Sequence, residues 1–347
     1  MEKKVIAIIF GGNSSEYEVS LQSASSVLEN INTEKYEIIP IGITRRGEWY
    51  RYNGEIDRIK NNTWCEDTGN LIPIVVSQSP KIGGIIELEQ KEARTVKIDL
   101  AFPVLHGKNG EDGTVQGLFE VANIPVVGCG TLSSALCMDK DMAHKLVGAA
   151  GISVPKSITI DAGMITELSS LTKELHYPLF VKPVRAGSSF GITKIYKEDE
   201  LEAAVRLALE HDERVIIEEN IEGFEVGCAI LGKDDLIVGR VDEIELTDGF
   251  FDYTEKYTLK TSRIYMPARI DKLCEKKVQE TAITIYRTLG CSGFARVDMF
   301  LQPTGRIVFN EVNTIPGFTS HSRFPNMMKG IGIDFKELVN KIIELAM

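Results

Sequence analysis

The sequence predicts an α/β protein that opens with a doubly wound, Rossmann-like parallel sheet and continues as an α+β structure. Three observations support this prediction. Apolar strands alternate with helices up to about residue 130, and short strands dominate after about residue 215. The 347 residues are 43% hydrophobic, which is enough to build two or three buried cores. We therefore expect three units, formed by residues 1–130, 131–215 and 216–347.

The first unit begins with "VIAIIFGGNSSEYEVS", an apolar run that meets Gly11-Gly12 and then opens a helix. This is a strand–turn–helix unit of the doubly wound type. Further strands are expected near 36–44 and near 97–107, where the second ends at His106 and the loop "HGKNGEDGT". A helix, "VQGLFEVA", and a strand, "IPVVGCG", complete the predicted parallel sheet.

The second and third units combine strands with a few helices. The stretch "TLSSALCMDKDMAHKLVGAAGI" predicts a helical connection, and "YPLFVKPVRAGSSFGITKIY" predicts two strands around a Gly/Ser loop. An amphipathic helix, "ELEAAVRLALEH", and a buried strand, "RVIIEENI", follow. Four more strands, "FEVGCAIL", "LIVGRVDEIEL", "GFARVDMFL" and "RIVFNEVN", predict a mostly antiparallel sheet, with helices near 273–289 and 333–346.

Composition excludes several classes of protein. A net charge of −11 argues against broad nucleic-acid binding, although a locally basic site for an anionic substrate stays possible. The sequence contains no run of eighteen apolar residues, so we expect no membrane span. The N-terminus lacks the pattern of a signal peptide. Six scattered cysteines without a C-x-x-C pair are typical of reduced thiols, so we expect a cytoplasmic protein.

The stretch "ARVDMFLQPTGRIVFNEVN" predicts a hairpin with its turn at residues 302–305. With Gln302 opposite Gly305, Arg296 lies opposite Glu311. Asp298 then lies opposite Phe309. Because side chains alternate between faces, four polar side chains share one face, those of Arg296, Asp298, Glu311 and Asn313.

Carboxylate and amide oxygens, without histidine or cysteine nearby, suit Mg²⁺ or Mn²⁺ better than zinc. Magnesium usually keeps waters and shares its shell with phosphate, so the hairpin predicts a metal–phosphate site. A cross-strand ion pair between Arg296 and Glu311 on a solvated face is the alternative.

Two further stretches fit a nucleotide. In "VKPVRAGSSFGITKI", Lys182 precedes a loop of small residues whose backbone amides can approach phosphate oxygens. This loop matches neither G-x-x-x-x-G-K-[ST] nor G-x-G-x-x-G, so an ordinary surface hairpin is equally compatible. In "VIIEENIEGFE", a buried strand leads into Glu218 and Glu225, which suits adenine and ribose, or is a plain acidic strand end.

Taken in order, these pieces resemble the D-alanine–D-alanine ligase family of the ATP-grasp fold. The resemblance covers nearly the whole chain and includes "FGGNSSEYEVS", "HGKNGEDGT", "MDKDMAHKL", "KPVRAGSSFG", "FFDYTEKY", "RVDMF" and "NEVNTIPGFTSHS". It implies an ATP-dependent ligase that forms a D-alanyl phosphate, uses two Mg²⁺ (or Mn²⁺) ions, supplies peptidoglycan synthesis and forms a homodimer. The resemblance also implies that the middle unit is a central subdomain that carries the phosphate loop. The last unit would then carry the metal site and a lid, "TDGFFDYTEKYTLKTSR".

The resemblance also implies roles for individual residues. ATP is contacted by Lys140, Lys182, Glu218, Glu219 and Ile221, with Glu225 on the ribose and Lys256 at the γ-phosphate. The metal ions are held by Asp298, Glu311 and Asn313. Glu16 binds the ammonium of the first D-alanine, and His106 lies near its carboxylate. Arg296 and the Gly317 amide stabilise the reacting acyl group, Ser188 and Tyr257 join Glu16 in a hydrogen-bonded set, and Ser322 binds the acceptor carboxylate.

One departure concerns the acceptor. Arg323 follows the serine of "SHS", where D-alanine–D-alanine ligases usually carry an apolar residue such as leucine. Asp242 is a possible partner for Arg323, and Phe251 stands where the family usually has tyrosine. These features resemble the vancomycin-resistance ligases of the G type, which join D-alanine to D-serine and so lower vancomycin binding. Tyr257 separates the chain from D-lactate ligases, and an ordinary D-alanine–D-alanine ligase with a surface-directed Arg323 is the alternative.

Three other classes of protein would each explain part of the sequence. A dinucleotide-dependent oxidoreductase would explain the first strand and its glycines, but not the acids of the hairpin. A nucleotide sensor without catalysis would not need Glu16, Ser188 and Tyr257 together. An ATP-grasp ligase for other carboxylates would share the hairpin but not "GGNSSEYEVS" or the "SHS" end.

Overall fold

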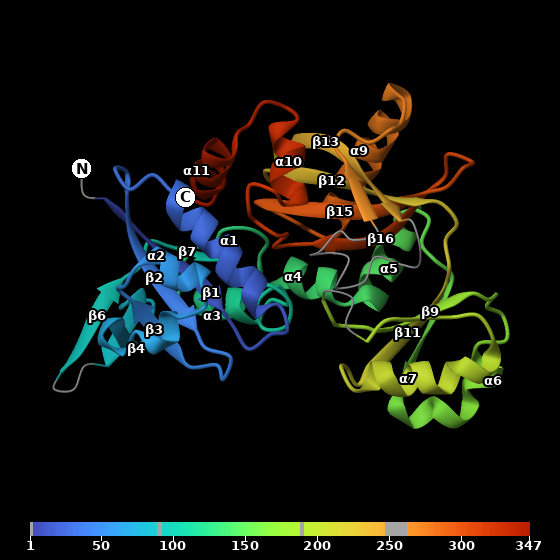
Figure 1. The fold of residues 1–347 in the computed structure, drawn as a ribbon, viewed down its shortest axis with the longest axis horizontal. Helices are drawn as coiled ribbons and strands as arrows, with labels where there is room; N and C mark the ends of the chain where they lie inside the picture. Colours follow the sequence, from blue (N-terminus) through green and yellow to red (C-terminus); the bar gives the residue numbers. More distant parts are fainter. Residues whose placement is uncertain (1–2, 89–91, 188–190, 247–261) are drawn as a thin grey trace.

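The computed structural model describes residues 3–88, 92–187, 191–246 and 262–347. These residues form three sheets. In Figure 1 the first sheet lies on the left, the third at the upper right and the second at the lower right, with α4 (Thr131–Met138) near the middle. Within the described ranges, no helix combines the length and apolar character needed to cross a membrane. All six cysteines are described, and all are free thiols.

The first sheet has the strand order β6-β5-β4-β3-β2-β1-β7. Its strands are β1 (Lys4–Gly11), β2 (Tyr36–Ile43), β3 (Trp49–Tyr52), β4 (Leu71–Val76), β5 (Gly84–Leu88), β6 (Ala93–Lys97) and β7 (Leu100–Pro103). The predicted parallel pairing holds for β2-β1-β7 only. Strands β3 to β6 add antiparallel neighbours, because connections such as residues 44–48 are too short for a crossover helix. The strand predicted in "IPVVGCG" is reduced to a single bridge at Val126.

Helices α1 (Tyr17–Asn30), α2 (Ile56–Lys60) and α3 (Thr114–Val121) belong to this unit. The chain also returns to it at its end, where α11 (Phe335–Leu345) packs beside α1 (Figure 1). Asn340 Oδ1 accepts from the Asn32 backbone N–H at 3.0 Å, and its amide donates to the Asn30 carbonyl. The first and last segments of the chain therefore share one core.

The second sheet is antiparallel, in the order β10-β9-β11-β8. Its elements are β8 (Ser157–Asp161), α6 (Leu168–Leu171), β9 (Leu179–Pro183), β10 (Thr193–Ile195), α7 (Leu201–Leu209) and β11 (Arg214–Glu219). Helix α7 forms as predicted because Leu201, Ala204, Val205 and Ala208 recur at helical spacing and are buried against the sheet.

The third sheet is antiparallel, in the order β14-β13-β12-β15-β16. Its strands are β12 (Phe224–Leu231), β13 (Ile237–Leu246), β14 (Ser262–Tyr265), β15 (Phe294–Leu301) and β16 (Ile307–Asn313), with helices α9 (Lys272–Thr288) and α10 (Arg323–Lys329). The chain also contains the short 3-10 turns Trp64–Glu66, Thr68–Asn70, Ala162–Glu167 and Glu198–Glu200.

The helical connection predicted over residues 131–152 is divided into α4 and α5 (Lys140–Ala149). Asp139 causes the break, because its side chain leaves the helix and accepts the Met142 backbone N–H at 3.0 Å as an N-cap. Lys140 therefore becomes the first residue of a new helix, and α5 packs against β16.

An aromatic cluster joins the first unit to the third sheet. Phe102 of β7 lies 6.4 Å from Phe294 of β15 and 6.4 Å from Phe318, measured between ring centroids. Each ring is fully buried, which is worth roughly 2–3 kcal/mol per side chain. This cluster holds the turn that contains Gly317 beside the carboxyl end of β7.

Candidate active site

A cavity of about 510 Å³ lies between the second and third sheets. Much of the predicted site lines this cavity, namely Lys140, Lys182, Glu218, Glu219, Ile221, Glu225, Arg296, Asp298, Glu311 and Arg323. Strands β9, β11, β12, β15 and β16 supply most of these side chains, because their polar residues alternate with buried apolar ones.

The hairpin that carries the acids has a different register from the predicted one. Asp298 pairs with Glu311, and Arg296 pairs with Asn313. The prediction that placed Arg296 opposite Glu311, and Asp298 opposite Phe309, is wrong. The turn is one residue longer than assumed, since Gln302 pairs with Arg306 rather than Gly305, and a β-bulge between Asp298 and Met299 shifts the register again.

The two shifts together move the pairing by an even number of residues. The four polar side chains therefore still share one face, and the two carboxylates are direct rather than diagonal neighbours.

Asp298 is almost fully buried and is surrounded by donors. Arg296 Nε and Nη2 donate to its two oxygens at 2.8 and 2.7 Å, and Asn313 Nδ2 donates to Oδ2 at 2.9 Å. Burial disfavours the charged form of Arg296, but the neighbouring Asp298 carboxylate outweighs this effect and raises the pKa of Arg296 above its ordinary value. A charged guanidinium is thus held beside the Asp298 carboxylate at the cavity wall.

The donor set of this hairpin fits a hard divalent cation. Asp298 and Glu311 face each other across two strands, Asn313 adds an amide oxygen, and neither histidine nor cysteine is in the set. Among the described residues, no group of three or more His, Cys, Asp or Glu side chains is arranged to hold a metal. A complete shell at this hairpin would therefore need water and phosphate oxygens, as Mg²⁺ commonly uses.

Two lysines bring positive charge to the same cavity. Lys182 Nζ donates to Glu218 Oε1, and Lys140 Nζ lies 3.7 Å from Glu311 Oε2. Burial opposes ionisation of Glu218, but Lys182 outweighs it and lowers the pKa of Glu218. Within the described residues, Glu218 Oε2 is buried without a hydrogen-bond partner, which leaves an acceptor for a bound ligand.

Glu16 lies beside a smaller cavity of about 40 Å³, which Lys140, Glu311 and Asn313 also line. A Cβ placed on Gly107 would lie 2.5 Å from Glu16 Oε2, and one on Gly187 would lie 2.4 Å from the same atom. These short distances place the Glu16 carboxylate against the backbone of two loops from different units.

His106 lines a separate cavity of about 260 Å³. Its two ring nitrogens lie 3.1 Å from Ser23 Oγ and 2.8 Å from the Ile315 carbonyl oxygen. The turn after β16 is also tied down by Glu111, whose Oε1 accepts the Ile315 N–H at 3.1 Å. Sequence reasoning missed Glu111, although it stands in the quoted loop "HGKNGEDGT".

Gly317 and Ser322 lie close together at the end of this turn. A Cβ on Gly317 would lie 3.2 Å from Ser322 Oγ, and the Ser322 hydroxyl lies 2.8 Å from Thr319 Oγ1. The predicted acyl-stabilising amide and the predicted acceptor-binding hydroxyl therefore belong to one compact loop.

Arg323 is buried, with 8% of its surface exposed, and it does not point to solvent. Its Nε and Nη2 donate to the two oxygens of Asp242 at 2.7 and 2.8 Å, and its Nη1 donates to Glu225 at 2.8 Å. These acids raise the pKa of Arg323 well above its ordinary value despite burial, so the guanidinium is a permanent charge. Burial raises the pKa of Glu225 to about 6.

Gly227 of β12 leaves the space for this cluster. A Cβ there would lie 2.4 Å from Arg323 Nη2 and 2.7 Å from Asp242 Oδ1. Sequence reasoning missed Gly227, and a glycine inside an otherwise apolar strand is the signal that could have marked a close approach.

The fold and this geometry agree with known proteins. Residues 5–129 match the family described as "D-ala D-ala ligase N-terminus", and residues 146–344 match "D-ala D-ala ligase C-terminus". The chain belongs to the D-alanine–D-alanine ligase family. Its members are ATP-dependent ligases of the ATP-grasp fold, so the predicted recognition, enzyme class and fold are confirmed.

Three relatives illustrate the match. The crystal structure of VanG D-Ala:D-Ser ligase from Enterococcus faecalis is 67% identical, covers 100% of both chains and superposes with a TM-score of 0.94. The vancomycin B-type resistance protein VanB from E. faecalis is 48% identical, over 100% of this chain and 99% of its own. A D-alanine–D-alanine ligase from Thermoanaerobacter sp. (strain X514) is 42% identical, over 100% and 97%.

Some predicted residues of this ligase lie outside the described residues, namely Ser188, Phe251, Lys256 and Tyr257. Their roles stay predictions. Other residues line the large cavity without having been predicted, including Phe180, Phe224, Phe300 and Arg269. Period-two alternation could have found Phe180 and Phe300, because they lie two residues from Lys182 and Asp298 on the same faces.

Proposed function

We propose that the protein is an ATP-dependent ligase that joins D-alanine to D-serine through a D-alanyl phosphate. The product would be a modified precursor dipeptide for cytoplasmic peptidoglycan synthesis, which lowers vancomycin binding. The single observation that carries the acceptor assignment is the buried Arg323, paired with Asp242 and Glu225 where an apolar wall would suit a methyl group.

The large cavity has the composition that ATP requires. We assign the base to the apolar lining of Phe180, Phe224 and Phe300, the ribose to Glu225, and the phosphates to Lys140 and Lys182. Glu219 and Ile221 lie at the edge of this pocket, where β11 ends and its backbone becomes available to adenine.

The first step joins two anions, because a D-alanine carboxylate must attack the γ-phosphorus of ATP. At about 4 Å and an effective dielectric constant near 20, each pair of like charges costs roughly 4 kcal/mol. Lys140, Lys182 and Arg296 would offset this repulsion, and Lys256 is assigned to the same role. Two Mg²⁺ ions at Asp298, Glu311 and Asn313 would supply further charge neutralisation when bound.

The second step is attack of the acceptor amine on the acyl carbon of D-alanyl phosphate, with release of phosphate. We assign the first ammonium to Glu16 and its carboxylate to the neighbourhood of His106. Developing negative charge on the acyl oxygen would be stabilised by Arg296 and the Gly317 N–H. Ser188 and Tyr257 would complete the hydrogen-bonded set with Glu16, and Ser322 would bind the acceptor carboxylate.

The acceptor hydroxyl distinguishes D-serine from D-alanine. The orientation of the Arg323 guanidinium is set by Asp242 and Glu225, and its Nη2 also lies 3.4 Å from Asp298 Oδ1. Its N–H groups are therefore presented at a fixed place, and a hydroxyl can accept from them. A methyl group in the same place would leave those polar groups desolvated without a partner, which costs free energy. Phe251 is assigned to the same wall of the site.

The test is phosphate release with D-alanine as first substrate and D-serine, D-alanine or D-lactate as acceptor, with product masses identified. The proposal predicts the highest kcat/KM for D-serine and a D-alanyl-D-serine product at neutral pH. A higher kcat/KM for D-alanine would make the protein an ordinary D-alanine–D-alanine ligase and would remove the role given to Arg323. A homodimer stays a prediction that size measurements can check.

A further inference from the structure

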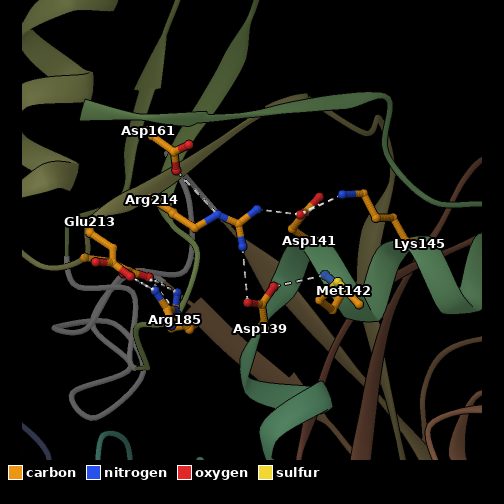
Figure 2. Close-up of polar contacts among 9 residues, drawn as sticks. Asp139, Asp141, Met142, Lys145, Asp161, Arg185, Glu213 and Arg214 are labelled. Atoms are coloured by element: carbon orange, nitrogen blue, oxygen red, sulfur yellow. Dashed lines mark hydrogen bonds and ion pairs between the residues drawn. The ribbon is translucent and has the colours of Figure 1, made fainter. Parts of the chain in front are cut away.

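A group of ion pairs surrounds Arg214, the first residue of β11, outside the cavities described above (Figure 2). Its Nη2 donates to Asp141 Oδ2 at 2.8 Å, and its Nη1 donates to Asp139 Oδ2 at 3.5 Å. A third acid, Asp161 of β8, lies 3.6 Å from Arg214 Nε. The arginine thus connects the second sheet to the first turn of α5.

Asp139, the N-cap of α5, and Asp141, in its first turn, flank Lys140, which lines both the large cavity and the small one. Asp139 also caps the helix through the Met142 N–H, and Asp141 also accepts from Lys145 Nζ at 2.8 Å. The side chains on either side of Lys140 are therefore held by Arg214, as Figure 2 shows.

The backbone makes the same connection a second time. The Lys140 N–H donates to the Val184 carbonyl at 3.2 Å, and the Val184 N–H donates to the Arg214 carbonyl at 3.0 Å. Val184 stands at the start of the Gly/Ser loop. Val184 therefore connects the backbone of Arg214 to the backbone of Lys140 through two hydrogen bonds.

The Lys140 side chain then reaches across the loop. Its Nζ donates to the Ala186 carbonyl at 3.0 Å and lies 3.7 Å from Glu311 Oε2. Neighbouring Arg185 is tied to the residues before Arg214, because its N–H donates to Asp212 at 2.7 Å and its Nη2 to Glu213 at 2.8 Å. The beginning of the loop and the start of α5 are thus both hydrogen-bonded to one short segment, residues 212–214.

We propose that Arg214 is a positioning residue for the nucleotide site. Its ion pairs with Asp139 and Asp141 hold Lys140 against the Gly/Ser loop, in a position where the lysine can bind the phosphates of ATP. This inference rests on the nucleotide site proposed above. Arg214 itself lines neither of the two cavities that Lys140 lines. It acts by keeping the second sheet and α5 in one arrangement, which two ion pairs and two backbone hydrogen bonds specify.

The test replaces Arg214 with methionine, which keeps the length of the side chain but removes its charge. Binding of AMP-PNP with Mg²⁺ is measured by titration calorimetry, and KM values for ATP and for D-alanine are measured separately. We expect the Kd for AMP-PNP and the KM for ATP to rise about tenfold, as loss of one or two partly exposed ion pairs implies. The KM for D-alanine and the D-serine to D-alanine preference should change less than twofold.

Three other variants make the result specific. Arg206→Ala is the matched control, because Arg206 pairs with Glu202 on the surface of the same unit and should leave nucleotide affinity unchanged. Arg214→Lys keeps the charge and should restore most of the affinity. Asp141→Asn should weaken nucleotide binding, and combined with Arg214→Met it should add less than the sum of the two single effects.

Wild-type affinity for AMP-PNP in a folded Arg214→Met variant would overturn the proposal, as would equal rises in the KM values for ATP and D-alanine. If Arg214→Met fails to fold, Arg214→Lys and Asp141→Asn decide the matter by the same readouts. Because the calorimetric test needs no acceptor, its outcome is independent of whether D-serine is the second substrate.

Discussion

Replacing Arg323 with leucine removes the feature on which the acceptor assignment depends. The guanidinium makes three hydrogen bonds of 2.7 to 2.8 Å to Asp242 and Glu225, and its Nη2 lies 3.4 Å from Asp298 Oδ1. A leucine would offer an apolar wall to the acceptor. We therefore expect Arg323→Leu to shift preference from D-serine toward D-alanine.

The size of the shift follows from the hydrogen bond that the hydroxyl loses. A hydrogen bond to a charged group contributes about 1.5–3 kcal/mol, which corresponds to a change of about 10- to 150-fold in the ratio of kcat/KM values. The assay is phosphate release with each acceptor at a fixed concentration of the first D-alanine. A ratio that stays within twofold of wild type would refute the reasoning.

The same substitution should cost stability, because Asp242 is fully buried and would lose its charged partner. Breaking a buried ion pair from one side costs about 3–5 kcal/mol. Urea denaturation should show this loss for Arg323→Leu, and a smaller loss for the double variant Arg323→Leu/Asp242→Asn, which removes the buried negative charge as well. An equal or larger loss in the double variant would contradict this account of the cluster.

Three further predictions concern the same site. Gly227→Ala should lower stability by about 1–3 kcal/mol in urea denaturation and reduce the preference for D-serine, because the added Cβ overlaps Arg323 and Asp242; unchanged stability would contradict the overlap. Glu311→Gln should raise the Mg²⁺ concentration for half-maximal activity about tenfold or more, and an unchanged magnesium dependence would remove Glu311 from the metal set. Burial raises the pKa of Glu225 from 4.5 to about 6, so the folded state holds a proton that the unfolded state releases in this interval. Stability should therefore fall by about 2 kcal/mol in total as pH rises from well below 4.5 to well above 6, with about 1.3 kcal/mol of the loss inside this interval. Glu225→Gln should remove that slope, and a slope that persists in the variant would show that other groups cause it.

Much of the site could be predicted because its residues lie on strands, where alternation alone assigns a face. Arg296, Asp298 and Glu311 were placed on one face although their pairing was wrong. The error came from a β-bulge and a three-residue turn, which leave no distinct mark in "QPTGRIVFNEVN". The turn and the bulge each shift the register by one residue. Together they move the pairing partner by two residues, and a shift of two leaves every side chain on the same face of the sheet.

Other features depend on contacts distant in sequence. Asp139 reads as one more helical residue until its cap to Met142 and its contact with Arg214 are seen. Glu111 and Ile315 are 204 residues apart, and no local pattern connects them. The antiparallel half of the first sheet was also missed, because β3 to β6 are short and partly exposed.

Competition between the two acceptors tests the central claim most directly. The enzyme is given ATP, Mg²⁺, and D-alanine and D-serine at equal concentration, and the dipeptide products are quantified by mass. The account predicts that D-alanyl-D-serine exceeds D-alanyl-D-alanine at neutral pH, and that Arg323→Leu reverses the order. A wild-type mixture dominated by D-alanyl-D-alanine would contradict it.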